Sequence, residues 1–187
     1  MDNETLNLIQ ARMANSAIGP STIRGMAPSG TIKYVRGFLA AYDLAQLMRW
    51  TQGTYIDQLD EVTDALLDHV QAEVEKRPAL EWGGCRKCVN IFLRNAMYNR
   101  YLAEAYRLDR LEPWMEVPLD SHVAAGLQNE RIQNTPRWHT VIGLTKDESE
   151  VWQGIASIVA GKKGIHRVHL DVHYWRRKKE DDEDGRK

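Results

Sequence analysis

Residues 82–96 read Trp-Gly-Gly-Cys-Arg-Lys-Cys-Val-Asn-Ile-Phe-Leu-Arg-Asn-Ala, and this stretch decides how the chain is organised. Paired glycines precede a run with helical apolar spacing, which predicts a long helix from about Arg86 to Leu108. Glycines before a helix let backbone N–H groups approach a ligand, and the free N–H groups of the first turn favour an anion. Arg86 and Lys87 lie at that same end, where a cation opposes the helix dipole. A bound phosphate would explain their position.

The remainder of the chain is also predicted to be helical, so the expected fold class is all-α. Four further segments have helical apolar spacing: residues 31–50 (one helix or two short ones), Thr54 to a stop at Pro78, Asp120 to about Gln128, and a capping-box helix from Thr145 to Gly161. Residues 164–175 alternate like a strand but place three histidines on one helical face. Because an isolated strand would have no partner, a helix is predicted there.

Composition limits the classes of protein that are possible. The 187 residues suffice for one domain or two small lobes, and no run approaches the 18 apolar residues of a membrane span. The N-terminus has neither the basic start nor the apolar core of a signal peptide, so a cytoplasmic protein is expected. The two cysteines exclude a disulfide framework and cannot alone complete a zinc or iron–sulfur site, so no metal and no cofactor are expected.

Charge is distributed unevenly along the chain. The formal net charge of −1 argues against a nucleic-acid partner, for which a basic domain is typical. Residues 51–83, however, carry a net charge of −6 on a helix with one acidic face, whereas residues 84–110 carry +4. One region is therefore suited to an anion. The charged residues 176–187 are predicted to form a solvated, disordered tail.

A second segment with possible chemistry reads Val-Pro-Leu-Asp-Ser-His-Val-Ala, residues 117–124. Asp120 follows a proline and precedes a predicted helix, which is the ordinary place for an N-cap. His122 taken alone is more typical of a packed or capping histidine than of a catalytic one. The segment gains meaning only beside residues 82–96.

Together the two segments resemble the helix-hairpin-helix (HhH-GPD) DNA glycosylase superfamily, in its endonuclease III-like branch without the iron–sulfur cluster. The family pattern is a Gly-rich hairpin, a basic pair entering a helix, a nearby Asn, and later an Asp-x-His after an aliphatic residue. The matching residues here are Gly83, Gly84, Arg86, Lys87, Asn90, Leu119, Asp120 and His122. The hairpin lacks the usual proline and is one residue longer, and the 33 residues from Lys87 to Asp120 exceed the usual spacing.

The resemblance implies a two-lobed helical bundle with the active-site cleft between the lobes. Residues 1–175 would form a single compact unit, with one lobe from roughly residues 30–110 and the other from residues 1–29 plus 111–175. The implied activity is a DNA N-glycosylase that flips and excises a damaged or modified base. Lys87 would be the nucleophile, whose Schiff base can add AP-lyase activity, and Asp120 would be the essential carboxylate.

The resemblance also implies how DNA is held by a monomeric enzyme. Backbone phosphate would be bound by Gly83, Gly84, Cys85 and Arg86. A flipped base needs aromatic stacking and a few hydrogen-bonding groups. The candidates are the loop 15–21 with Asn15, then Arg24, Trp82, Tyr98, Tyr101, Trp114, His122, Trp138 and His139.

Two other functions are compatible with the sequence. A catalytically silent DNA-binding module would use the hairpin only to hold phosphate, and a helical interaction domain would bind a protein through the acidic face of residues 51–83. The sequence does not name the base. The excised base could be oxidised, alkylated, deaminated or deliberately modified. Host repair and defence against modified foreign DNA are therefore both compatible with the sequence.

Overall fold

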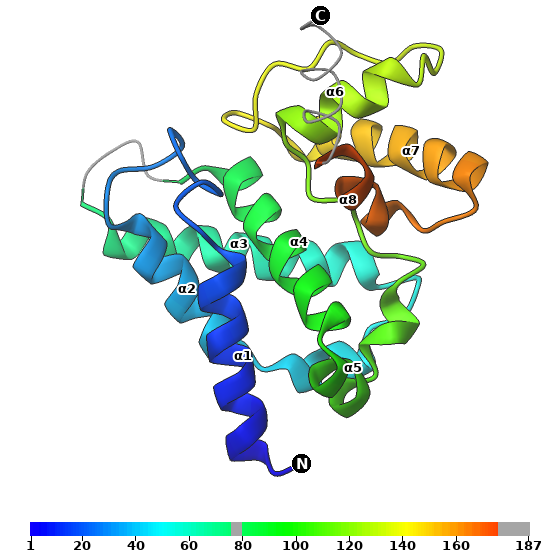
Figure 1. Ribbon diagram of the computed structural model, residues 1–187. Coiled ribbons are helices and arrows are strands. Elements are labelled where there is room, and N and C mark those ends of the chain that lie inside the picture. The colour runs from blue at the N-terminus through cyan, green and yellow to red at the C-terminus, as the bar shows by residue number, and fades with distance from the viewer. Residues whose placement is uncertain (76–79, 176–187) are drawn as a thin grey trace, which may run out of the picture.

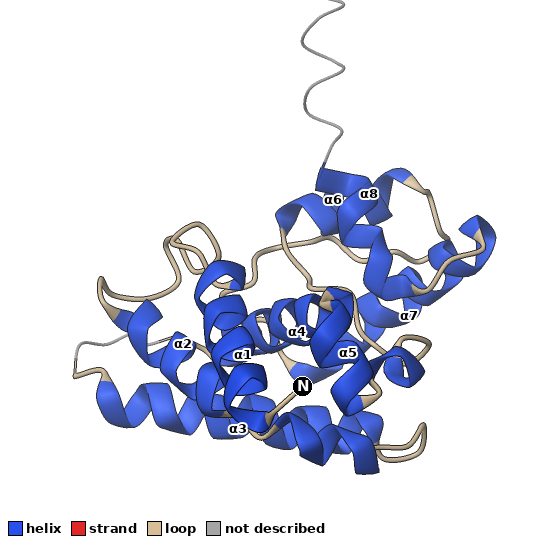
Figure 2. Ribbon diagram, turned by 60° about the horizontal axis from the view of Figure 1, so that its bottom comes forward, coloured by secondary structure: helices blue, strands red, loops and turns tan. Residues whose placement is uncertain are grey.

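The computed structural model describes residues 1–75 and 80–175, and every regular element in these ranges is a helix (Figures 1 and 2). The α-helices are α1 (Asn3–Ala17), α2 (Thr31–Ala41), α3 (Tyr55–Glu73), α4 (Trp82–Tyr98), α5 (Arg100–Tyr106), α6 (Ser121–Asn129), α7 (Lys146–Lys163) and α8 (Leu170–Trp175). Three 3-10 helices, η1 (Leu44–Arg49), η2 (Leu108–Leu111) and η3 (Arg167–His169), connect them. The predicted all-α class is therefore confirmed. The predicted stop at Pro78 and the predicted tail 176–187 lie outside the described residues.

Helices α1 to α5 enclose the first of two hydrophobic clusters. Its deeply buried members on successive helices include Val35, Leu39, Leu59, Leu66, Phe92 and Leu102. A buried amide ties α1 to α2, because Gln10 Nε2 donates to the carbonyls of Leu39, Ala40 and Tyr42 at 3.0, 3.2 and 2.6 Å. These are carbonyls at the end of α2 that lack a partner within the helix.

Helices α6, α7 and α8 enclose the second cluster, which lies at the upper right in Figure 1. Its buried residues include Val117, Leu127, Trp152, Val159, Leu170 and Tyr174. The side chain of Gln153 binds both the N–H and the carbonyl of Val117, at 3.1 and 2.8 Å, and so fixes the chain where it enters this cluster. None of the helices in the described ranges has the length and apolar character that a membrane span requires.

The predicted division of the chain into lobes is wrong at its N-terminal end. Residues 1–29 were expected beside residues 111–175, but Leu6, Met13 and Ile18 are buried in the first cluster. The physical reason is that α1 has an apolar stripe of its own, which packs against α2 and α4. Along the chain, the first cluster gives way to the second between Met115 and Val117, and Val168 of η3 returns to the first cluster.

Several helix ends follow the local chemistry. Residues 31–50 form two short elements, α2 and η1. The predicted capping box is present, with Thr145 and Glu148 each accepting the other's backbone N–H. Helix α7 passes the predicted end at Gly161 and stops at Gly164, whose φ of 66° is the left-handed conformation that glycine tolerates. Of residues 164–175, which are predicted to be helical, residues 167–175 form η3 and α8, whereas residues 164–166 are a turn.

The long helix predicted over residues 86–108 is two helices. Helix α4 begins earlier, at Trp82, and ends at Tyr98, because the side chain of Asn99 accepts the N–H groups of Tyr101 and Leu102 and begins α5. The paired glycines consequently lie within the first turn of α4 instead of before it. At Gly83 an added Cβ would lie 2.4 Å from the carbonyl oxygen of Val141.

Replacing Gly83 with alanine tests this close approach. A backbone carbonyl cannot move aside cheaply, so Gly83→Ala should lower the free energy of unfolding by about 1–3 kcal/mol. The matched control is Gly154→Ala in α7, where an added Cβ would meet nothing within 4 Å. Because alanine has the higher helix propensity, this variant should raise the free energy of unfolding by about 0.5–1 kcal/mol. Urea unfolding measures both. Equal stabilisation of the two variants would contradict the packing of Gly83.

Candidate functional site

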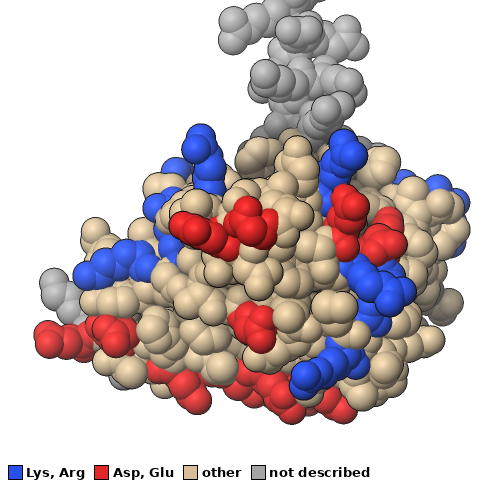
Figure 3. Space-filling view, turned by 90° about the horizontal axis from the view of Figure 1, so that it is seen from below, with Lys and Arg blue, Asp and Glu red and all other residues tan. Residues whose placement is uncertain are grey.

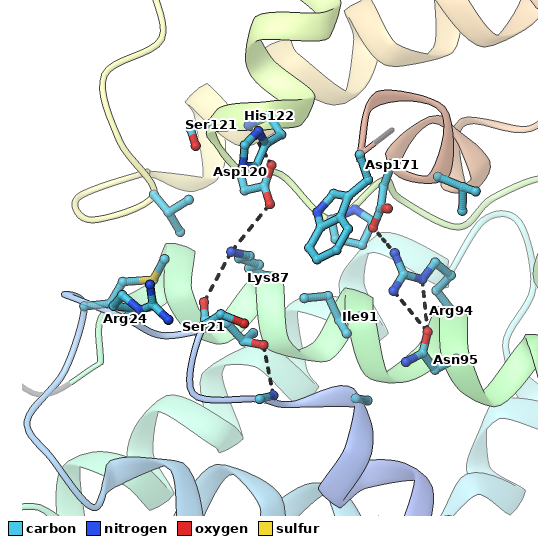
Figure 4. A pocket seen from close by; sticks show the side chains of 18 of the residues that line it. Ser21, Arg24, Lys87, Ile91, Arg94, Asn95, Asp120, Ser121, His122 and Asp171 are labelled. Carbon is cyan, nitrogen blue, oxygen red and sulfur yellow. Dashed lines mark hydrogen bonds and ion pairs between the residues drawn. The ribbon is translucent and has the colours of Figure 1, made fainter. Parts of the chain in front are cut away.

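A cavity of about 940 Å³ lies where the two hydrophobic clusters meet the N-terminal segment (Figure 4). Its walls come from four parts of the chain: residues 16–26, one face of α4, the start of α6 with residues 138–142, and α8. The α4 face consists of Lys87, Ile91, Arg94, Asn95 and Tyr98. Spacings of four, seven, eight and eleven residues place these side chains on one side of a helix.

Lys87 and Asp120 meet in this cavity, as Figure 4 shows. Lys87 Nζ is 3.7 Å from Asp120 Oδ2, and the two side chains are 9% and 19% exposed. Lys87 Nζ also donates a hydrogen bond to the carbonyl oxygen of Thr22 at 3.2 Å. The amine is therefore held between a carboxylate from one cluster and a backbone carbonyl from the N-terminal segment.

Asp120 has a separate task for each carboxylate oxygen. Oδ1 accepts the backbone N–H groups of His122 and Val123 at 2.9 and 3.0 Å, so Asp120 is the N-cap of α6. Oδ2 points to Lys87. The ordinary N-cap interpretation is thus correct, and it is compatible with a second role. The cap fixes the rotamer that presents Oδ2 to the cavity.

Arg86 points away from the cavity into a buried ion pair. Its Nε and Nη2 donate to the two carboxylate oxygens of Glu116 at 2.8 and 3.1 Å, and its Nη1 donates to Asp60 at 2.8 Å. Burial alone would lower the pKa of Arg86, but the carboxylates of Glu116 and Asp60 raise it overall. With the residue 4% exposed, the prediction that Arg86 binds a DNA phosphate is wrong.

The other three predicted phosphate-binding residues are also buried. Gly83, Gly84 and Cys85 lie in the first turn of α4, against Val141, Leu80 and the first hydrophobic cluster. A phosphate cannot reach their backbone N–H groups in this arrangement, so this part of the prediction is wrong too. The thiols of Cys85 and Cys88 are buried as well. Burial raises the pKa of Cys88 to about 12, although the nearby charge of Lys87 acts to lower it.

The predicted base-pocket residues divide into two groups. Arg24, Tyr98, His122, Trp138 and His139 line the cavity. Four others lie outside the cavity. Asn15 donates to the carbonyl of Ala11 in α1, and Trp82 packs against the guanidinium of Arg86. Trp114 packs against the first cluster, and Tyr101 is exposed on α5. For Asn15 the reason is that α1 extends to Ala17, so its side chain stays on the helix.

The sequence reasoning missed the polar groups farther along α4. Arg94 forms an ion pair with Asp171 of α8 and donates to Asn95, and Figure 4 shows both contacts in the cavity wall. The signal was available, because Arg94 and Asn95 follow Lys87 at helical spacing. Asp171 could not be found this way, since α8 is placed beside α4 only by folding. In the described ranges, no three His, Cys, Asp or Glu side chains converge as metal ligands do.

The acidic face of α3 is partly structural. In Figure 3 acidic side chains gather along the lower edge, where Figure 2 places α3. Asp57, Glu61 and Asp68 are exposed, as predicted. Asp60, in contrast, binds Arg86 and, with Asp64, Lys146 of α7 at 3.6 and 3.0 Å.

Comparison of the chain with protein-family models, with curated proteins and with solved structures finds no match.

Replacing Glu116 tests the buried ion pair. Glu116→Gln keeps the shape but removes the charge that faces Arg86, so the free energy of unfolding should fall by about 3 kcal/mol. Glu104→Gln, at an exposed position of α5, is the matched control and should change it by less than about 0.5 kcal/mol. Urea unfolding of the two variants measures the difference. A loss no larger than the control's would mean that Arg86 does not need this partner.

Proposed function

We propose that the chain is a DNA N-glycosylase whose nucleophile is Lys87 and whose essential carboxylate is Asp120. The observation that carries the proposal is the approach of Lys87 Nζ to Asp120 Oδ2, 3.7 Å apart in a cavity large enough for a nucleotide. Lys87 lies on α4, which packs in the first cluster, and Asp120 caps α6, which packs in the second. The two residues are 33 positions apart in the sequence. They are the pair that the helix-hairpin-helix resemblance singles out.

The chemistry follows from these two groups. Asp120 accepts a proton from the Lys87 ammonium as the amine attacks the anomeric carbon of the sugar. The bond from that carbon to the base breaks, and the base leaves with the electron pair and takes up a proton. The positive charge that develops on the sugar while this bond breaks is stabilised by Asp120 as a carboxylate, so the proton of Lys87 reaches Asp120 only as the amine bonds to the carbon. Opening of the sugar ring gives a Schiff base at Lys87, from which β-elimination of the 3′ phosphate can follow.

In this proposal the two hydrophobic clusters correspond to the two lobes of a helix-hairpin-helix glycosylase. A base flipped from the duplex enters the cavity between them, where Trp138 offers an aromatic surface. Because Gly83, Gly84, Cys85 and Arg86 are buried, other cations must hold the DNA backbone. Arg24 with the exposed Arg131 and Arg137 would supply them.

The enzyme is favoured over the two alternatives. A silent module that grips phosphate through the hairpin depends on the same four buried residues. A protein-binding domain that uses the acidic face of α3 gives no reason for a lysine and an aspartate to meet in a cavity.

Borohydride trapping tests the nucleophile. Sodium borohydride reduces a Schiff base to a stable amine, so the chain incubated with its substrate duplex should form a covalent complex visible on a denaturing gel. Lys87→Ala should abolish the complex, whereas Lys162→Ala, at an exposed lysine of α7, should leave it unchanged. Duplexes with oxidised, alkylated, deaminated and deliberately modified bases are screened in parallel. Trapping that persists in Lys87→Ala would show that another amine reacts.

Asp120→Asn tests the carboxylate without removing the helix cap. Asparagine is as good an N-cap as aspartate, so α6 should stay folded, but it cannot accept the lysine proton. Base release should fall at least about 100-fold while DNA affinity in a gel-shift assay changes little. Asp120→Ala serves as the comparison that also loses the cap. Asp120→Asn with wild-type base release would refute the mechanism.

A further inference from the structure

A hydrogen-bonded chain of three side chains starts at the cavity wall, at the C-terminal end of α4. Tyr98, which lines the cavity, lies 2.6 Å from His169 Nδ1 through its hydroxyl oxygen. His169 Nε2 lies 2.5 Å from Glu112 Oε1. The rings of Tyr98 and His169 also stack, with centroids 5.7 Å apart and planes only 6° from parallel. The phenol is thus held in one orientation by a histidine and a carboxylate that the proposed reaction does not use.

When His169 is neutral, the directions of the hydrogen bonds in this chain follow from Glu112. A carboxylate only accepts, so Nε2 of His169 must carry the hydrogen that faces Glu112. In a neutral imidazole the other nitrogen then has a lone pair, so Nδ1 accepts and the Tyr98 hydroxyl must donate to it. Burial raises the pKa of Tyr98, which keeps that hydroxyl protonated. In this neutral form of His169, only the lone pairs of the Tyr98 oxygen are left for the cavity.

The position of Tyr98 decides what it can touch. It follows Lys87 by eleven residues on α4, a distance of about 16 Å along the helix axis, whereas Arg94 lies about 10 Å along it. Helical side chains lean toward the N-terminus, so the tips of Lys87 and Tyr98 are about as far apart as their backbones. A purine that is attached to the sugar at Lys87 and lies along α4 reaches the level of Arg94 and ends about a helical turn short of Tyr98.

We infer that the enzyme selects bases bearing a polar substituent that extends beyond the ring edge, and that Tyr98 accepts a hydrogen bond from an N–H or O–H group on that substituent. This inference rests on the proposed glycosylase function. Tyr98 is the specificity-determining residue, and His169 and Glu112 are positioning residues that keep its oxygen an acceptor. The substrate class is thus deliberately modified or adducted bases, in preference to bases altered by a single atom.

Three matched pairs of duplexes test the substrate class. The pairs are cytosine and its glucosylated 5-hydroxymethyl derivative, adenine and N6-(carbamoylmethyl)adenine, and 7-deazaguanine and its 7-aminomethyl derivative. Duplexes that carry oxidised, deaminated or alkylated bases are assayed beside them. The wild type should release at least one extended base about tenfold faster than its unextended partner and than the small lesions. Tyr98→Phe should reduce that preference to within twofold. Tyr101→Phe, at an exposed tyrosine outside the cavity, should keep it.

The direction of the hydrogen bond is tested separately. On the base that is released, a carbamoylmethyl group, which donates, is compared with its methyl ester, which only accepts. In Glu112→Lys the new ammonium can only donate to Nε2, so the hydrogen of His169 should move to Nδ1. The Tyr98 O–H is then free to donate into the cavity, and the preference should move to the ester. Glu112→Gln keeps a carbonyl acceptor and should keep the wild-type preference. The 15N chemical shifts of the His169 ring, expected to report Nε2–H in the wild type, give the tautomer without any substrate.

The outcomes separate this inference from the function beneath it. Release of small lesions with no preference for extended bases would overturn the inference and leave the glycosylase proposal standing. An Nδ1–H tautomer of His169 in the wild type, or an unchanged preference in Tyr98→Phe, would also overturn it. No base release from any duplex and no borohydride complex would refute the glycosylase proposal and this inference with it.

Discussion

The buried ion pair between Arg86 and Glu116 is the constraint on which the arrangement of the site depends. Two parallel hydrogen bonds fix the guanidinium against the carboxylate, and Asn90 adds a third to Glu116 at 2.9 Å. Arg86 belongs to α4 and the first cluster, whereas Glu116 immediately precedes Val117, where the second cluster begins. An uncompensated charge at either position would be costly inside the protein, so the two clusters cannot separate here without losing stability.

The ion pair also places the two reactive residues. Lys87 is next to Arg86, about 100° farther around α4, and points into the cavity. Asp120 follows Glu116 by four residues. Anchoring Glu116 on α4 therefore brings the start of α6 to within 3.7 Å of Lys87. The basic pair divides its roles, with the arginine holding the structure together and the lysine available for chemistry. This division resolves why two cations stand at a helix start, where the dipole opposes them.

Local patterns predicted the parts of the site that depend on neighbours in sequence. Asp120 as an N-cap and Thr145–Glu148 as a capping box are set by backbone N–H groups within three residues, and both are present. The failures lie at residues whose environment comes from distant segments. Gly83 looked like an open ligand-binding position, yet the loop that carries Val141 covers it. The predicted lobe boundary failed for the same reason, because the apolar stripe within residues 1–29 does not indicate which helices α1 packs on.

The sequence by itself determined the helical class, most helix positions and the identity of Lys87 and Asp120 as candidates. Hydrophobic periodicity and capping are local, so they can be read from the order of residues. Only the tertiary structure decided that Arg86 is a buried partner and not a phosphate ligand, that Arg94 meets Asp171, and that Tyr98, His169 and Glu112 form one chain. These contacts join residues far apart in sequence, and the free energy that selects them comes from packing the two clusters together.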